Sequence, residues 1–131
     1  MIELHDVTKR YPDGTVAVDS FSAQFPPRTT TVLLGSSGSG KTTISRSVGG
    51  IHDQWEGSIA LQGEALPRGS RKRTAEQRQR VQYIFQNPYL SLNPRRTVEQ
   101  ILVRPLEVFG LASGRKARER AAELLESVQL G

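Results

Sequence analysis

The chain has 131 residues, of which 36% are hydrophobic and 24% charged, a composition typical of one globular domain and not of a disordered chain. It contains no cysteine, which excludes disulfides and thiolate metal sites, and its two histidines, His5 and His52, are too scattered in the sequence for a metal cluster. The formal net charge is +5. No apolar run approaches the ~20 residues of a membrane-spanning helix, so we expect neither a membrane span nor an N-terminal signal peptide.

The first 25 residues predict an antiparallel hairpin. Apolar and polar residues alternate over 2–7 and more loosely over 16–25, which is typical of half-buried strands. Between them, Tyr11-Pro-Asp-Gly14 predicts a turn, because proline fixes one backbone dihedral angle and Asp-Gly supplies the positive φ that hairpin turns require. We expect this hairpin at the edge of a larger sheet.

A buried strand, a glycine-rich loop and a helix are predicted next. Residues 29–34 (TTTVLL) are rich in β-branched side chains and end in an apolar run, which favours a strand buried on both faces of a parallel sheet. This strand would lead directly into the loop 35–42 (GSSGSGKT). Residues 41–48 have the composition of a helix, and Gly49 and Gly50 would end it.

The middle of the chain predicts a short strand over 58–62 and a helix over 74–80, where Thr74 and Gln77 have capping-box spacing. Many of the chain's cations lie in residues 68–80. No aromatic side chains are interleaved with them for base stacking, so a solvated face or a docking surface for a partner is favoured over nucleic-acid binding. An alternative is that the charge is unbalanced because part of a larger domain is missing.

The last third predicts a strand over 81–85 (VQYIF), an irregular stretch over 86–96 with two prolines and two asparagines, and two helices. Thr97 can cap the first helix, which we expect to end at residue 104. The second is predicted over 113–128, because apolar side chains form one stripe at positions 117, 121, 124, 125 and 128.

The loop 35–42 matches the phosphate-loop pattern G-x-x-x-x-G-K-T in full. Its glycines would let backbone N–H groups converge on phosphate oxygens, and the following helix would add the positive end of its dipole. Lys41 would bind the β- and γ-phosphates, and the Thr42 hydroxyl would coordinate Mg²⁺. A flexible glycine-serine linker is disfavoured by the strand and helix predicted on either side. The candidate nucleotide-binding residues of this region are Gly35, Ser36, Ser37, Gly38, Ser39, Gly40, Lys41, Thr42 and Thr43.

Three features in order narrow the class of phosphate-loop protein: the Tyr11 turn, the loop, and a strand that ends in Phe85-Gln86. With them the chain resembles the N-terminal half of an ATP-binding-cassette (ABC) domain. The run from Tyr89 to Arg95 resembles the ATPases that drive import of dipeptides, oligopeptides and nickel. The resemblance covers essentially all 131 residues. It implies an α/β phosphate-loop NTPase core over residues 1–86, a partial parallel sheet flanked by helices with an antiparallel β edge, followed over 87–131 by the start of a helical subdomain.

The resemblance also implies roles for individual residues, with ATP and Mg²⁺ as cofactors. Tyr11 would stack on adenine and Val16 would touch the base or ribose. Gln86 would reach Mg²⁺ and the attacking water, because its neutral amide both accepts and donates hydrogen bonds. It would be catalytic together with Lys41, and a metal ligand together with Thr42. The alternatives are an aromatic residue that closes a hairpin at Tyr11 and a polar strand terminus at Gln86.

The sequence departs from the family's pattern in two places. Pro26-Pro27-Arg28-Thr29 replaces the usual Pro-Gly-Glu turn, a surface change that should not touch the site. The Leu-Ser-Gly-Gly-Gln signature, the acidic Mg²⁺-binding strand with the catalytic glutamate, and the switch histidine are not found in these 131 residues. His5 and His52 lie too early for that histidine and are interpreted as surface or partly buried polar residues. We therefore expect a truncated domain whose C-terminal half is absent, and which binds MgATP weakly or not at all without hydrolysing it.

The function that the resemblance implies is that of the ATP-binding subunit of an ABC transporter importing peptides, nickel or a similar solute. The expected partners are membrane permeases, through the stretch that begins at Asn87 and ends at Arg96, a second nucleotide-binding domain, and indirectly a solute-binding protein. No nucleic acid is expected, and the location would be the cytoplasmic face of the cell membrane. A cassette ATPase outside transport, a phosphotransferase and a non-catalytic interaction fragment are the alternatives. Whether the chain alone is an enzyme is left open by its sequence.

Overall fold

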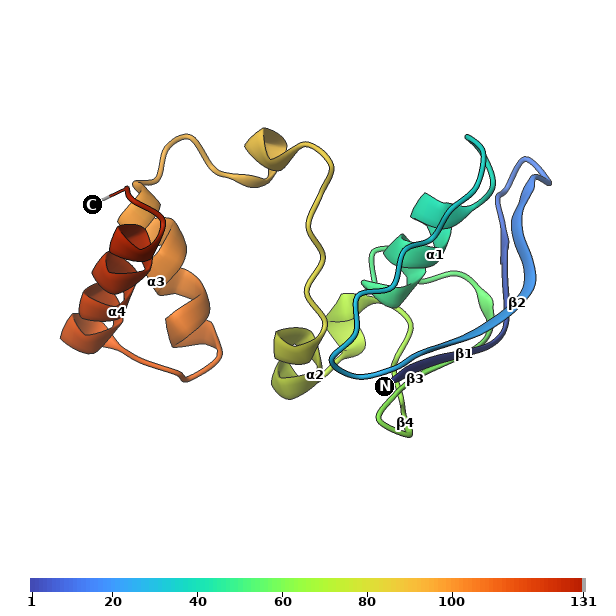
Figure 1. Ribbon diagram of the computed structural model, residues 1–131, viewed down its shortest axis with the longest axis horizontal. Helices are drawn as coiled ribbons and strands as arrows, with labels where there is room; N and C mark the ends of the chain where they lie inside the picture. The colour runs from blue at the N-terminus through green and yellow to red at the C-terminus, as the bar shows by residue number, and fades with distance from the viewer. Residues whose placement is uncertain (131) are drawn as a thin grey trace. The chain divides into compact units, whose positions relative to one another are not determined.

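The computed structural model describes residues 1–130, without the side chains of Pro88 and Leu90. The chain forms two compact units, Met1–Tyr83 and Ile84–Gly131 (Figure 1). Among the described residues, the first unit holds the sheet and two α-helices, and the second holds two further α-helices. The last residue of the predicted domain, Gly131, lies outside the described residues. The expected α/β class is therefore confirmed at the level of a mixed α/β fold with an antiparallel sheet.

The sheet of the first unit has the strand order β2-β1-β3-β4, and each pair of adjacent strands is antiparallel. Its strands are β1 (Ile2–Arg10), β2 (Val16–Phe25), β3 (Glu56–Leu61) and β4 (Glu64–Ala65). The predicted hairpin is confirmed as β1 and β2. In its turn the Gly14 N–H donates to the Tyr11 carbonyl at 2.9 Å, and Gly14 has the positive φ of 86° that the Asp-Gly pair predicted.

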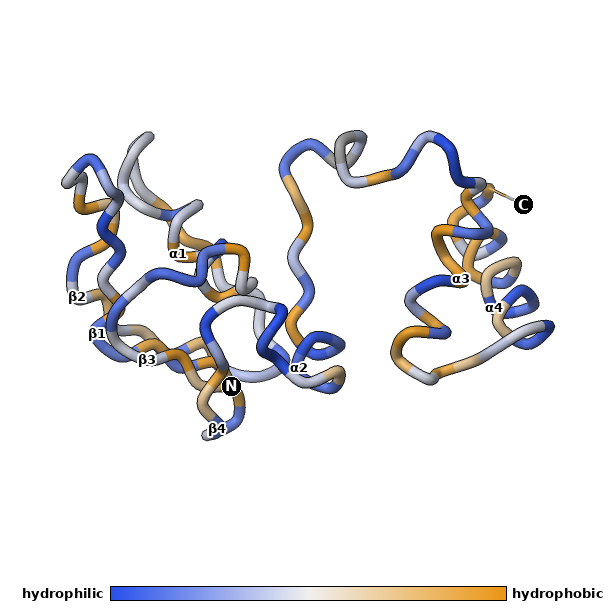
Figure 2. The backbone as a smooth tube through the Cα atoms, turned by 180° about the vertical axis from the view of Figure 1, so that it is seen from behind, coloured by the Kyte–Doolittle hydropathy of each residue, from blue (hydrophilic) through white to orange (hydrophobic). Residues whose placement is uncertain are grey.

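One face of this sheet packs against helix α1 (Lys41–Val48), whose predicted bounds are confirmed. Leu4 of β1 and Ile59 of β3 stand opposite each other, and both are only 1% exposed. Apolar residues recur along both strands (Figure 2). Burying one such side chain stabilises the fold by about 1.5–3 kcal/mol. The buried core consists of Leu4, Val7, Val18, Ile44, Trp55, Ile59 and Leu66.

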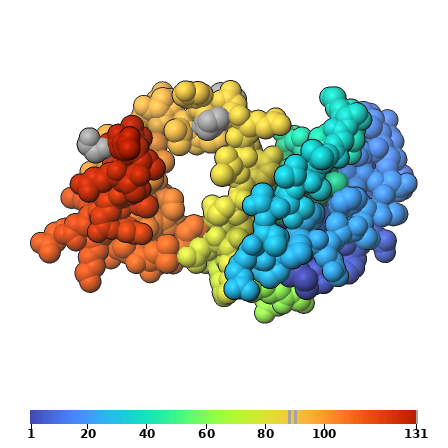
Figure 3. All heavy atoms as spheres, viewed as in Figure 1, coloured from blue at the N-terminus to red at the C-terminus, as the bar shows by residue number. Residues whose placement is uncertain are grey.

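The predicted strands over 29–34 and 81–85 are wrong for this structure, because neither stretch forms a strand. Residues 26–39 run over the surface of the first unit, in cyan in Figure 3, with Leu34 88% exposed. Both stretches border a cavity of about 480 Å³ beside α1. A β-branched run becomes a strand only where a neighbouring backbone accepts its hydrogen bonds. Among residues 1–130 no segment pairs with either stretch, so the expected parallel sheet is not formed there.

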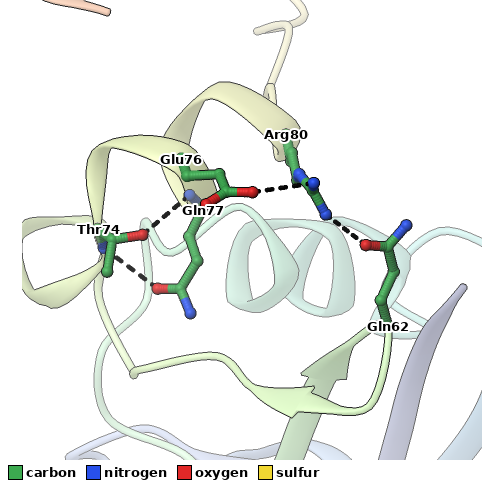
Figure 4. A network of polar contacts seen from close by, with 5 residues as sticks. All are labelled: Gln62, Thr74, Glu76, Gln77 and Arg80. Atoms are coloured by element: carbon green, nitrogen blue, oxygen red, sulfur yellow. Dashed lines mark hydrogen bonds and ion pairs between the residues drawn. The ribbon is translucent and has the colours of Figure 1, made fainter.

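Helix α2 (Ala75–Arg80) confirms the predicted capping box. The Gln77 N–H donates to Thr74 Oγ1 at 3.1 Å, and the Thr74 N–H donates to Gln77 Oε1 at 3.1 Å. Figure 4 shows the polar contacts of this helix: Arg80 forms a 2.9 Å ion pair with Glu76 within α2, and it also donates to the side chain of Gln62, which follows β3.

The second unit consists mainly of helices α3 (Val98–Val108) and α4 (Gly114–Ser127). Thr97 and Gln100 form a reciprocal capping box at the start of α3, so the predicted cap is confirmed. The helix continues four residues beyond its expected end. Pro105 removes one N–H donor, but its backbone geometry is compatible with a helix and its carbonyl accepts from the Phe109 N–H at 3.0 Å.

The contact between α3 and α4 depends on small side chains. Ala117 and Ala121 of α4 are both fully buried, while Glu99 of α3 and Arg118 of α4 form an exposed ion pair at 3.8 Å. The stretch 86–96, predicted to be irregular, contains a short 3₁₀ helix at Pro88–Ser91 that the prolines did not predict. Among residues 1–130 no helix is long and apolar enough to cross a membrane.

Candidate nucleotide-binding site

The phosphate loop (residues 35–42) depends on glycine at two points. Gly40 has a φ of 84°, and a Cβ there would lie 2.5 Å from the Ala17 carbonyl oxygen of β2. At Gly35, a Cβ would lie 2.6 Å from Ser39 Oγ, inside the curve of the loop. Gly40 therefore lets the loop lie directly against the sheet. Gly35 keeps the interior of the loop open, as a loop that receives a phosphate group requires.

The side chain of Lys41 folds back across this interior. Its Nζ donates to the carbonyl oxygens of Gly35 at 2.8 Å and Ser36 at 2.6 Å, and to Ser39 Oγ at 3.0 Å. The ammonium group thus lies at the start of α1, close to the positive end of the helix dipole. Two positive features meet inside one loop, an arrangement that suits a multiply charged anion.

The two threonines that follow the lysine differ in exposure. Thr43 is buried, and its carbonyl accepts from Ser47 Oγ at 2.9 Å. Thr42 is exposed beside Lys41, so its hydroxyl is free to bind a ligand. An exposed hydroxyl oxygen beside an anion-binding loop fits the donor set that Mg²⁺ prefers. Elsewhere in residues 1–130, no group of three or more His, Cys, Asp or Glu side chains is arranged to hold a metal ion.

Tyr11 lies at the first turn of α1, on the buried side. Its hydroxyl is 3.4 Å from Thr43 Oγ1 and 3.5 Å from His52 Nε2. The ammonium of Lys9 lies 5.1 Å from the centroid of the Tyr11 ring, within cation–π range. The fold therefore brings the Tyr11 turn to the helix that carries the phosphate loop, with one ring face already covered.

Val16 lies next to a residue that contacts the phosphate loop, whereas Gln86 belongs to the other unit. Val16 is 42% exposed and directly precedes Ala17, whose carbonyl faces Gly40. Gln86 is exposed and belongs to the second unit, so its approach to the phosphate loop stays a prediction. The stretch 87–96 is exposed wherever its side chains are described, and its role toward a permease likewise stays a prediction.

Arg73 is a residue that the sequence analysis missed. Within the basic segment 68–80, interpreted as a solvated face or a docking surface, it is buried with 3% exposure. Its guanidinium donates to the carbonyls of Val48 at 2.7 Å, Pro67 at 3.1 Å and Ser47 at 3.5 Å. Burial lowers the pKa of Arg73 from its ordinary value. The charge caps the C-terminal end of α1, but nothing in the run of cations marks which one turns inward.

The chain belongs to the ABC transporter family, whose sequence model matches residues 18–131. It is 42% identical over 132 residues to the oligopeptide transport ATP-binding protein OppF of Bacillus subtilis, covering 98% of this chain and 42% of that protein. It is 43% identical over 98 residues to a putative peptide import ATP-binding protein of Brucella ovis, covering 75% of this chain and 31% of the relative. Its identity to the glutathione import ATP-binding protein GsiA of Escherichia coli K12 is 39% over 114 residues, covering 87% of this chain and 18% of the relative.

These matches confirm the expected resemblance to peptide-import ATPases. The chain spans 42% or less of the length of each of these three relatives. Similarity to these relatives therefore does not by itself show the activity of this chain, the solute that it would help to import, or its partners.

Proposed function

We propose that the chain is the MgATP-binding part of an ABC importer ATPase. The observation that carries this proposal is the position of the Lys41 ammonium, which the carbonyls of Gly35 and Ser36 hold inside the phosphate loop. A triphosphate entering the loop would replace these carbonyl oxygens with phosphate oxygens, which carry full negative charge and bind the ammonium more strongly. The names of the relatives, which describe oligopeptide, peptide and glutathione transport or import, support the importer class.

The nucleotide would lie along the first turn of α1. Backbone N–H groups of residues 35–42 would bind the phosphates, and Tyr11 would stack on adenine with the ring face that Lys9 leaves open. Val16, exposed beside the strand residue that faces Gly40, would touch the base or the ribose. Support for this pose comes from the closeness of Tyr11 to Thr43.

Mg²⁺ would be held by oxygen atoms of this chain and of the phosphates. The Thr42 hydroxyl and the Gln86 amide oxygen would be the protein's ligands to the ion, and the bound ion would neutralise phosphate charge. Gln86 would also orient the attacking water through its NH₂ group. We propose that these residues position reactants without supplying a general base, because the sequence contains no Asp-Glu pair. The chain by itself would then bind MgATP weakly and not turn it over.

In a complete importer, ATP binding and hydrolysis would drive import of a peptide or a similar solute. The proposed partners are membrane permeases, reached through residues 87–96, and a second nucleotide-binding domain, with a solute-binding protein acting indirectly. The location would be the cytoplasmic face of the membrane. A phosphate-loop NTPase core belongs to the same proposal, although the strands that residues 1–130 form are all paired antiparallel.

Calorimetric titration of the 131-residue chain with MgATP tests this function. We expect weak, saturable binding that Lys41→Ala abolishes, while Lys72→Ala, which removes an exposed lysine far along the sequence, leaves the Kd unchanged. A parallel phosphate-release assay should show no turnover. The proposal is wrong if the unaltered chain does not bind MgATP, or if Lys41→Ala binds it equally well.

A further inference from the structure

We propose that His52 is a positioning residue that fixes the ring of Tyr11 for stacking on the nucleotide base. This inference rests on the proposed function and adds to it a residue outside the phosphate loop and the Tyr11 turn. His52 lies four residues beyond the end of α1, in a segment to which the sequence analysis gave no function.

The backbone of His52 is held on both sides. Its N–H donates to the Arg46 carbonyl of α1 at 3.2 Å, and its own carbonyl accepts from the Trp55 indole Nε1 at 3.2 Å. Trp55 is only 5% exposed and belongs to the hydrophobic core. The direction in which the imidazole leaves the backbone is thus set by a helix and by the core, and not by a free loop.

The imidazole meets Tyr11 at its hydroxyl end. Nε2 lies 3.5 Å from Tyr11 Oη, and the two rings are edge to face, with centroids 6.1 Å apart and an angle of 80°. Thr43 Oγ1 lies 3.4 Å from the same hydroxyl. Each polar contact is long for a hydrogen bond and weak alone. His52 and Thr43 together can accept one hydrogen bond from the Tyr11 hydroxyl and donate another to it. The two contacts restrict rotation of the Tyr11 ring more than either contact would alone.

The third contact concerns the face of the ring. Lys9 of β1, 5% exposed, places Nζ over one face of Tyr11 at 5.1 Å from the centroid. A purine therefore has only the opposite face on which to stack. Burial, with Lys9 and Arg46 nearby, lowers the pKa of His52, while Asp53 opposes this shift. A neutral imidazole with its proton on Nδ1 can accept from the Tyr11 hydroxyl at Nε2, and with its proton on Nε2 it can donate to that hydroxyl.

This arrangement orders the ring before the base arrives, which reduces the entropy lost on binding. Loss of His52 should therefore weaken binding of the base and leave the phosphate contacts intact. Inorganic triphosphate has phosphates but no base, so comparing it with ATP separates the two effects.

The test measures the Kd of the 131-residue chain for MgATP and for magnesium triphosphate by calorimetry. We expect His52→Ala to raise the Kd for MgATP about three- to tenfold, the loss of one weak polar contact and one ring contact, and to leave the Kd for triphosphate unchanged. His52→Gln, which keeps a side-chain hydrogen-bonding group, should restore much of the MgATP affinity. His5→Ala, at an exposed histidine of β1, is the matched control and should change neither Kd.

The outcomes separate this inference from the proposed function. If binding remains sensitive to Lys41→Ala but the ratio of the two Kd values is unchanged in His52→Ala, only the positioning role of His52 is wrong. An equal rise for both ligands, with or without a fall in melting temperature, also overturns it, because His52 would then support the fold or the loop in general. If His52→Ala does not fold, His52→Leu, which fills the space without a polar atom to contact Tyr11, takes its place, and its ratio decides in the same way. A chain that binds neither ligand overturns both proposals.

Discussion

Arg73 Nη1 donates a 2.7 Å hydrogen bond to the carbonyl oxygen of Val48, the last residue of α1. A buried cation at the C-terminal end of a helix interacts favourably with the helix dipole and satisfies carbonyls that have no partner within the helix. The first turn of the same helix carries the phosphate loop. The basic segment 68–80 is thus tied to the helix that positions the candidate site.

Arg73→Ala should lower the free energy of unfolding of the first unit by about 2 kcal/mol, because buried carbonyls lose a charged donor. Arg71→Ala is the matched control: it removes an exposed arginine two residues away and should change stability by no more than about 0.5 kcal/mol. Urea unfolding followed by Trp55 fluorescence measures both, since Trp55 is the chain's one tryptophan and lies in the core of the first unit. Equal effects of the two substitutions would refute the capping role.

Two glycines of the phosphate loop offer a second comparison. Gly38 and Gly40 have nearly the same φ, 82° and 84°, so alanine at either position is strained by about 1–2 kcal/mol. Only at Gly40 would the new Cβ also meet a backbone atom, the Ala17 oxygen at 2.5 Å, which should cost about 1–3 kcal/mol more. The same fluorescence assay measures the difference. If Gly38→Ala destabilised the chain as much as Gly40→Ala, the loop would not lie against β2 as described.

His52 should make stability depend on pH. Its pKa is lowered from 6.5 in the folded chain by burial and by Lys9 and Arg46, with Asp53 acting in the opposite direction and the hydroxyl of Tyr11 in contact. Below about pH 6.5 the unfolded chain binds the proton first, so this contribution is present above that pH and is lost as the pH falls through the lowered pKa. Urea midpoints at pH 8, 7, 6 and 5 should fall more for the unaltered chain than for His52→Gln. Parallel pH profiles would contradict this expectation.

The buried alanines of α4 leave no room for larger side chains at their positions in the second unit. Ala121→Leu adds volume where the side chain is 0% exposed and should destabilise the helix pair by about 1–3 kcal/mol. Ala122→Leu, an exposed position on the same helix, should have an effect within about 0.5 kcal/mol. Because the second unit has no tryptophan, amide hydrogen exchange of α3 is the suitable measurement. Faster exchange in Ala121→Leu alone is the expected result.

The elements that the sequence predicted correctly are those whose signals are local. The Asp13-Gly14 turn, the capping box at Thr74 and the helix cap at Thr97 each depend on residues within a few positions of one another. The strands expected over 29–34 and 81–85 depend on partners elsewhere in the chain, and an apolar run shows what a segment would bury without showing what lies beside it. Those two expectations were wrong for this reason.

The candidate site divides in the same way. The glycines and Lys41 of the phosphate loop are recognisable from spacing alone, and the structure shows the loop closed around the lysine. Arg73 and His52 act through contacts with residues more than 20 positions away, Val48 and Tyr11, so no pattern in the sequence marks them. The contacts of Arg73 and His52 could be identified only from the three-dimensional structure.

The contacts of Lys41 imply that nucleotide binding at the proposed site would be an exchange of hydrogen-bond partners and not a simple addition. A phosphate group that binds the ammonium would replace the carbonyls of Gly35 and Ser36 as its acceptors. The binding enthalpy would be the difference between the hydrogen bonds that the ammonium makes to neutral oxygens and those that it makes to phosphate oxygens, and therefore smaller than the phosphate contacts alone would give. The free loop is in this sense occupied by its own lysine, which keeps the loop's shape while no nucleotide is bound.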